Sequence, residues 1–170
     1  GAHLGKQPYG YTSFRYDLTP HLKAGSNLLA VRVNVQQPCS RWYSGAGIYR
    51  HVWLTITDPV HVAPWGTYVT TPGVADAAAQ VRVRTRVQNE SAEGVTATLT
   101  TTIIDADVKK ISEHQTAEQF AAGGSLEFDQ TLKVENPRRW SLEEPYLYQV
   151  VSEVRVGGRL VDRYETPFGI

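Results

Sequence analysis

Apolar and polar residues alternate along much of the chain, and this period of two predicts β-strands. In the clearest run, Val81, Val83 and Val87 share one face with a threonine, and arginines occupy the other face. Similar runs cover residues 29–35, 95–103 and 146–156. A strand with two unlike faces packs one on a core and turns the other to water, which is typical of antiparallel sheets. The chain is therefore predicted to be all-β.

Helical signals are weak in comparison. Residues 112–121 are the best helical candidate, although their alanines and glutamines suit a loop equally well. Residues 17–22 are expected to form one helical turn, with Thr19 as its cap and Pro20 at the first helical position. Glycine-rich and polar turn signals separate the strand runs, and Gly157 with Gly158 predicts a tight hairpin.

A domain boundary is predicted near Asp58 and Pro59. The 58 residues before it hold too few strand runs to close a sandwich unaided. Residues 59–170 hold six or seven runs with the spacing of a complete β-sandwich. The chain contains no methionine and opens directly on structured-looking sequence, so we expect it to be a piece of a longer protein.

Residues 40–50 stand out because they combine aromatic, arginine and glycine residues without alternation. Ser40, Arg41 and Trp42 are the candidate binding residues of this segment. Sugars present hydroxyls and apolar C–H faces, and arginine offers a planar fork of donors while tryptophan offers a flat apolar face. Packing between two domains is the competing interpretation of the same residues.

Three groups of residues resemble glycoside hydrolase family 2. The first precedes residue 34 and includes Tyr9, Gly10, Tyr11, Asp17, Leu18, Thr19, Gly25 and Asn27. The second is the 40–50 segment followed by Val52, Trp53 and Leu54. The third comprises Asn136, Pro137, Trp140, Ser141, Glu144, Pro145, Leu147 and Tyr148, and is followed by Phe168, Gly169 and Ile170. The order and spacing match from end to end, with departures at Cys39 and His51.

The resemblance implies that residues 1–58 are the C-terminal portion of a jelly-roll sugar-binding domain. It implies an immunoglobulin-like β-sandwich over residues 59–170, ending at the junction to a catalytic (β/α)8 barrel. The parent would be a retaining glycosidase, most similar to bacterial β-galactosidases, although β-glucuronidases and β-mannosidases share the architecture. Its partners would be that barrel and a β-galactoside, with a homo-oligomer left open. Ser40, Arg41 and Trp42 would help to shape the sugar pocket.

Two other functions remain open: a stand-alone carbohydrate-binding module, and an immunoglobulin-like interaction module with no link to sugars. The chain itself is expected to lack catalytic residues, because the resemblance assigns both catalytic glutamates to the barrel. Glu143 and Glu144 form the only acidic doublet, and neighbouring side chains of an extended segment point to opposite faces.

Composition excludes several further classes. The 17 basic and 17 acidic residues balance, so nucleic acid and anionic membranes are not expected partners, and no apolar run is long enough for a membrane helix. One cysteine, Cys39, permits no internal disulfide. The five histidines lack ligand spacing, so no metal or cofactor is expected.

Asn89 heads a formal glycosylation sequence, which has no meaning in a bacterial protein. The compartment stays open between bacterial cytoplasm and periplasm.

Overall fold

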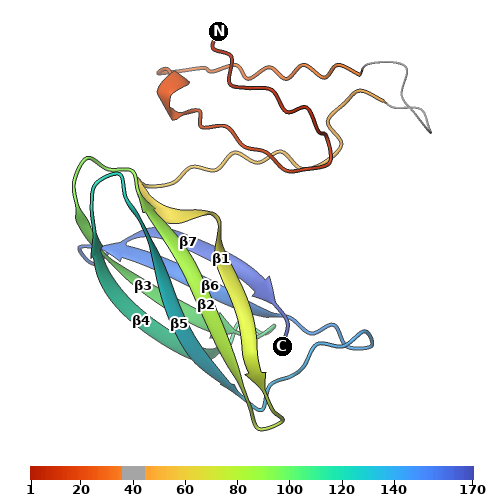
Figure 1. The fold of residues 1–170 in the computed structure, drawn as a ribbon, viewed down its shortest axis with the longest axis vertical. Coiled ribbons are helices and arrows are strands. Elements are labelled where there is room, and N and C mark those ends of the chain that lie inside the picture. The colour runs from red at the N-terminus through yellow and green to blue at the C-terminus, as the bar shows by residue number, and fades with distance from the viewer. Residues whose placement is uncertain (36–44) are drawn as a thin grey trace. The chain divides into compact units, whose positions relative to one another are not determined.

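The computed structural model describes residues 1–35 and 45–170, and the chain divides into two units, Gly1–Trp53 and Leu54–Ile170 (Figure 1). All seven strands of the described residues belong to the second unit. They are β1 (Val60–Val74), β2 (Ala78–Asn89), β3 (Val95–Ile104), β4 (Lys110–Phe120), β5 (Ser125–Glu135), β6 (Tyr148–Val156) and β7 (Arg159–Phe168). The all-β prediction is confirmed, while the domain boundary near Asp58 stays a prediction.

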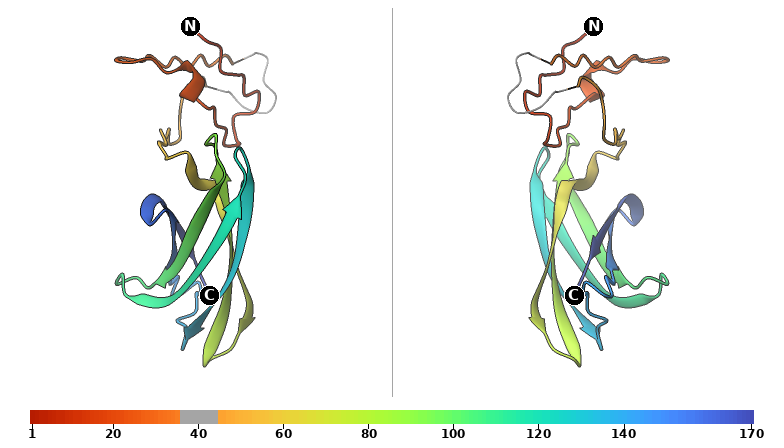
Figure 2. Two further views of the ribbon diagram at one scale, coloured as in Figure 1. Left: turned by 90° about the vertical axis from the view of Figure 1, so that its left-hand side faces the viewer. Right: turned by 90° about the vertical axis from the view of Figure 1, so that its right-hand side faces the viewer.

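The strands form two antiparallel sheets that face one another (Figure 2). One sheet has the order β1-β2-β5 and the other the order β4-β3-β6-β7. Every pairing within them is antiparallel, and the β6–β7 connection is the tight hairpin predicted at Gly157 and Gly158, both at positive φ. Seven antiparallel strands in two facing sheets are the arrangement of an immunoglobulin-like sandwich.

The inner faces of the sheets enclose two apolar clusters with a polar layer between them. Leu99, Phe128 and Val154 belong to the first cluster, and Val83 and Val150 to the second. The layer between them consists of four side chains that are at most 1% exposed: Thr85, Thr101, Gln130 and Ser152. The Gln130 side-chain amide donates to the Leu99 carbonyl at 3.3 Å and to the Thr116 hydroxyl at 3.0 Å. This bond pair links the two sheets across the layer.

Two sequence predictions of secondary structure were wrong. Residues 112–121 are not helical, because most of them form β4, which pairs with β3 along its length. Residues 29–35 form no strand in the described chain, and Leu29, Val31 and Val33 are exposed. An extended segment becomes a strand only when a neighbour accepts its backbone hydrogen bonds. Strand pairing therefore overrode helical propensity in residues 112–120, and residues 29–35 are irregular because they lack a paired neighbour.

The beginning of the sandwich is fastened to β7. Arg159 donates to both carboxylate oxygens of Asp58, at 3.1 and 3.2 Å. The amide of Val62 donates to the Asp162 carboxylate at 2.8 Å. These contacts join residues about 100 positions apart, so they close the sandwich between its first and last strands. The described chain has no helix that is both long and apolar enough to cross a membrane.

The arginine stripe on β2 is largely neutralised by β5. Arg82 forms an ion pair with Asp129, and its Nε lies 2.8 Å from that carboxylate. Arg84 lies 3.5 Å from Glu127 and covers the ring of Tyr68, 4.9 Å from its centroid. The stripe is thus mainly a ladder of cross-strand pairs, as expected for a solvated face.

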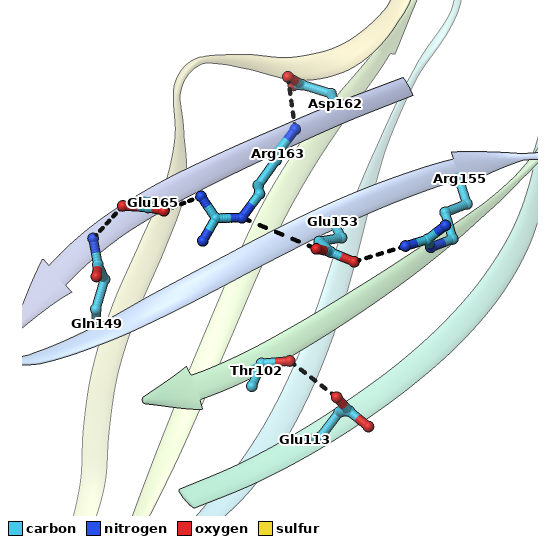
Figure 3. Close-up of polar contacts among 8 residues, drawn as sticks. All are labelled: Thr102, Glu113, Gln149, Glu153, Arg155, Asp162, Arg163 and Glu165. Carbon is cyan, nitrogen blue, oxygen red and sulfur yellow. Dashed lines mark hydrogen bonds and ion pairs between the residues drawn. The ribbon is translucent and has the colours of Figure 1, made fainter. Parts of the chain in front are cut away.

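The outer face of the other sheet carries a similar network (Figure 3). Arg163 on β7 lies between Glu165 and Glu153, and Arg155 donates to Glu153 at 3.1 Å. Gln149 donates to Glu165 at 2.6 Å. Exposed pairs of this kind contribute little to stability individually, and here they make the face polar and nearly balanced in charge.

We expect the Asp129 carboxyl to titrate below the ordinary aspartate pKa of about 3.9. The hydrogen bond from Arg82 is the main cause of this lowered pKa. A depressed pKa adds stability at pH values above the unfolded pKa, and this contribution disappears as the pH falls through the folded pKa. Carboxyl chemical shifts followed by NMR between about pH 2 and 6 measure the midpoint. Arg82→Ala should raise it toward the ordinary value, and an unchanged midpoint would contradict the assignment.

Candidate functional site

The predicted binding residues Ser40, Arg41 and Trp42 lie outside the described residues, so their role stays a prediction. The chain after them is described from Gly45 onward. Tyr49 in this following segment donates its hydroxyl to the Gly10 carbonyl at 3.4 Å. This bond joins the segment to the Tyr9–Tyr11 region, although the two are 39 residues apart.

Arg50 covers an aromatic ring. Its guanidinium lies 5.2 Å from the centroid of Tyr49, within the range of a cation–π contact. The rings of His51 and Trp53 follow at 5.5 Å from each other. The segment after the predicted binding residues therefore contains two such pairs, Arg50 with Tyr49 and His51 with Trp53.

Further aromatic pairs lie in the first unit. The rings of Tyr9 and Tyr11 are 5.6 Å apart, and those of Phe14 and Tyr16 are 5.7 Å apart. All four side chains are exposed. Aromatic faces of this kind suit the C–H faces of sugars, but they also suit protein packing. The first unit is thus rich in exposed aromatic surface.

The turn at Asp17 is structural, as the sequence suggested, but its cap differs from the prediction. The helical turn is a 3₁₀-helix, Thr19–His21, with Pro20 inside its first turn. Thr19 does not supply the cap; its backbone N–H instead donates to the Asp17 carboxylate at 2.9 Å. That hydrogen bond is the main cause of a lowered pKa at Asp17.

The aromatic residues near the end of the chain serve mainly to pack the sandwich. Tyr148 is buried, and its hydroxyl accepts the Arg138 amide at 2.8 Å. Tyr146 meets the Tyr148 ring edge-on at 5.0 Å and lies beneath the Arg138 guanidinium at 4.5 Å. Trp140 is about half exposed and lines a shallow hollow with Leu147, Gly169 and Ile170. Two of the three rings are therefore unavailable as a sugar platform.

Glu144, of the acidic doublet in the sequence, takes part in structural contacts. Glu144 lies 3.4 Å from Arg138, and its amide is held by the Ser141 hydroxyl at 3.0 Å. A general acid needs a raised pKa, whereas the pKa values of Asp17 and Asp129 are both lowered. Residues 1–35 and 45–170 contain no group of three or more His, Cys, Asp or Glu side chains that could hold a metal ion.

Asn89 is structural, although it heads a formal glycosylation sequence. The side chain is 1% exposed, and its amide nitrogen donates to the carbonyls of Glu93 and Ala121 at 2.8 and 3.0 Å. Its oxygen accepts the amide and the hydroxyl of Ser91 at 3.0 and 2.6 Å. A nitrogen buried in this way cannot receive a glycan in the folded protein.

Sequence analysis did not predict a bulge in β1. The ladder pairs Val62 with Val87 and next Thr67 with Thr85, so residues 63–66 oppose Arg86 alone. Trp65 projects from this bulge and is 69% exposed. A proline and a glycine on either side of Trp65 were the available signal, because both are unusual inside a strand.

A comparison with family profiles matches residues 60–170 to the family described as "Glycosyl hydrolases family 2". Over its whole length the chain is 46% identical to "Beta-galactosidase BoGH2A" of Bacteroides ovatus, and 33% identical to a "Beta-glucuronidase" of Formosa agariphila. It spans 20% of the length of each of these two curated relatives.

Solved structures agree with the sequence comparison. A glycosyl hydrolase family 2 member from Bacteroides cellulosilyticus DSM 14838 superposes with a TM-score of 0.85 at 30% identity. The match covers 99% of this chain and 23% of that one. The similarity therefore extends to both units of the chain, and it concerns a minor part of the larger protein.

Proposed function

The chain belongs to glycoside hydrolase family 2, and we propose that it is the non-catalytic β-sandwich portion of a retaining glycosidase that cleaves β-galactosides. The 46% identity to the Bacteroides ovatus β-galactosidase over the whole chain carries this proposal. The alternative is that the parent is a β-glucuronidase. A "Beta-glucuronidase" and a "Putative beta-glucuronidase" of Formosa agariphila are 33% and 35% identical to the chain.

The division of labour follows from the chemistry of the reaction. Retaining hydrolysis needs two carboxylic groups about 5–5.5 Å apart, one as nucleophile and the other as acid and base. Asp17, Asp58 and Asp129 instead accept hydrogen bonds that hold the fold together. We assign both catalytic groups to a barrel outside this chain. The sandwich would support that barrel, and residues 1–58 would be the end of a jelly-roll domain beside it.

Ser40, Arg41 and Trp42 would extend toward the sugar pocket of the parent enzyme. The aromatic and cationic groups of Tyr49 and Arg50 support this proposal, since they continue the same chemistry along the chain. A guanidinium can donate to two sugar hydroxyls at once, and an indole can lie against a pyranose face.

Arg41→Ala in the parent enzyme should lower kcat/KM for a β-galactoside by about 10- to 100-fold, because it would remove charge-assisted hydrogen bonds worth about 1.5–3 kcal/mol. Steady-state kinetics measure the effect. Arg32→Ala is the matched control, since Arg32 is an exposed arginine of the same unit, and it should change kcat/KM by less than about twofold. Equal kinetics for Arg41→Ala and the wild type would assign the segment to packing.

Initial rates of the parent enzyme on p-nitrophenyl β-galactoside, β-glucuronide and β-mannoside test the specificity. We expect kcat/KM for the galactoside to exceed the other two by about 100-fold or more. A preference for the glucuronide would replace the proposed specificity by the alternative. Turnover of none of the three would contradict the proposed function.

A stand-alone carbohydrate-binding module remains a second candidate because of the exposed aromatic residues Tyr9, Tyr11 and Phe14. Calorimetric titration of the 170-residue chain with galactose and lactose separates the two proposals. Measurable heat of binding would favour the binding module. Family membership argues against an interaction module that has no link to sugars.

A further inference from the structure

Trp65 combines two unfavourable features, a positive φ and an exposed indole ring. Its φ is 55°, in the left-handed region that bulky residues avoid. Its side chain is 69% exposed, and no aromatic or cation–π contact involves it among the described residues. Backbone strain of this kind persists where surrounding structure enforces it, and it is concentrated at functional contacts.

The sequence next to Trp65 is built to maintain the bulge. A Cβ at Gly66 would lie 2.5 Å from the Ala63 carbonyl oxygen and 3.0 Å from the Arg86 carbonyl oxygen. Only glycine therefore fits at this position. Ala63 is buried on the other side of Trp65, so the loop is anchored at both ends and Trp65 is its exposed residue.

Arg86 lies opposite the bulge and differs from the other arginines of its strand. Arg82 and Arg84 have carboxylate partners on β5. Arg86 is exposed and has no carboxylate partner in residues 1–35 and 45–170. The ladder thus brings an exposed indole and an unpaired positive charge to the same level of the sheet.

We propose that Trp65 and Arg86 form a contact site for another part of the parent polypeptide, one that presents an apolar pocket beside a carboxylate. This inference rests on the part of the proposed function that makes the chain one portion of a longer polypeptide, and it does not require that polypeptide to be active. Two observations select this occupant. The relatives carry about four fifths of their length outside the matched region, given that the chain spans 20% of them. The unpaired Arg86 calls for a negative charge, and tryptophan and arginine are the residues that most often dominate protein contacts.

Hydroxyl-radical footprinting read by mass spectrometry tests the contact, with the 170-residue chain and the parent enzyme compared side by side. We expect Trp65 to be oxidised readily in the chain and about fivefold or more slowly in the parent, because contact residues lose their solvent access. Val108, which is 75% exposed and also at positive φ, is the control and should react equally in both. Equal oxidation of Trp65 in chain and parent would overturn the proposal.

Three other outcomes would also overturn the proposed contact, because each would show that something else covers Trp65. Slow oxidation in the 170-residue chain would mean that the chain covers its own tryptophan. Protection that appears in the parent only after lacto- or gluco-oligosaccharides are added would indicate a sugar site. Protection that disappears when the parent is diluted would indicate a second copy of the protein.

A pair of glycine variants gives an independent readout. Trp65→Gly and Val108→Gly both relieve a positive φ, so neither should lower the thermal midpoint of the 170-residue chain. In the parent, Trp65→Gly should lower the midpoint and Val108→Gly should not. Arg86→Gln, which removes the charge without placing a second carboxylate opposite Glu127, should likewise lower it in the parent alone. Equal effects in chain and parent would contradict the contact. Neither readout depends on glycosidase activity, so an inactive parent that protects Trp65 would refute the proposed function and leave this contact standing.

Discussion

Asn89→Ala is expected to lower the free energy of unfolding of the sandwich by about 4 kcal/mol, because four hydrogen bonds of about 1 kcal/mol each are lost. The Asn89 side chain connects the end of β2 with the 89–93 turn and with the β4–β5 turn, through Ser91, Glu93 and Ala121. Few other single side chains of the sandwich join so many segments.

Urea unfolding followed by circular dichroism measures the effect. Glu90→Ala is the matched control, since that neighbouring side chain is exposed and its backbone amide keeps its bond to the Pro59 carbonyl. The control should change stability by less than about 0.5 kcal/mol. A loss of similar size in both variants would show that Asn89 does not organise these turns.

Gly66→Ala should be the second severe change, at a cost of about 3 kcal/mol, because the new methyl group would overlap backbone atoms that cannot move independently. The nearest of these is the Ala63 carbonyl oxygen, at 2.5 Å from the position of the added Cβ. The β1 bulge would have to open or shift its register with β2.

Gly73→Ala in the same strand provides the comparison. Its added Cβ would meet only the Gln80 side-chain oxygen at 3.7 Å, an ordinary contact. That variant should be neutral or slightly more stable, because alanine reduces the freedom of the unfolded chain. Thermal unfolding of the two variants measures the difference. Similar midpoints would contradict the tight geometry at Gly66.

The second half of the fold could be predicted because its alternation is strict. Val81, Val83 and Val87 point inward as expected, and the arginines between them lie on the outer face. The period of two also placed Thr85 on the inner face, but it could not reveal that Thr85 belongs to a polar layer across both sheets. That layer depends on strand register, which local sequence does not determine.

The first half was harder to predict because pairing partners decide whether an extended segment becomes a strand. Residues 29–35 alternate as clearly as β2 does, yet no partner strand is present for them in the described chain. Prediction of the candidate site is limited in the same way, because local sequence does not reveal how distant segments are arranged. Sequence chemistry singled out Ser40, Arg41 and Trp42, whereas Trp65 passed unnoticed because its importance lies in a positive φ and a bulge.

Evidence for function comes from two levels that agree. Comparison places the whole chain in glycoside hydrolase family 2, and Asp17, Asp129 and Asp162 accept structural hydrogen bonds. The sandwich is well suited to a supporting role, since Asp58 and Asp162 tie its first strand to its last. These observations support the proposal that the parent protein catalyses and that this chain supports it.

Hydrolysis of p-nitrophenyl β-galactoside, measured side by side for the parent enzyme and the 170-residue chain, tests the central claim most directly. We predict steady turnover by the parent and, for the chain alone, a rate equal to that of buffer. Turnover by the isolated chain would contradict its non-catalytic role.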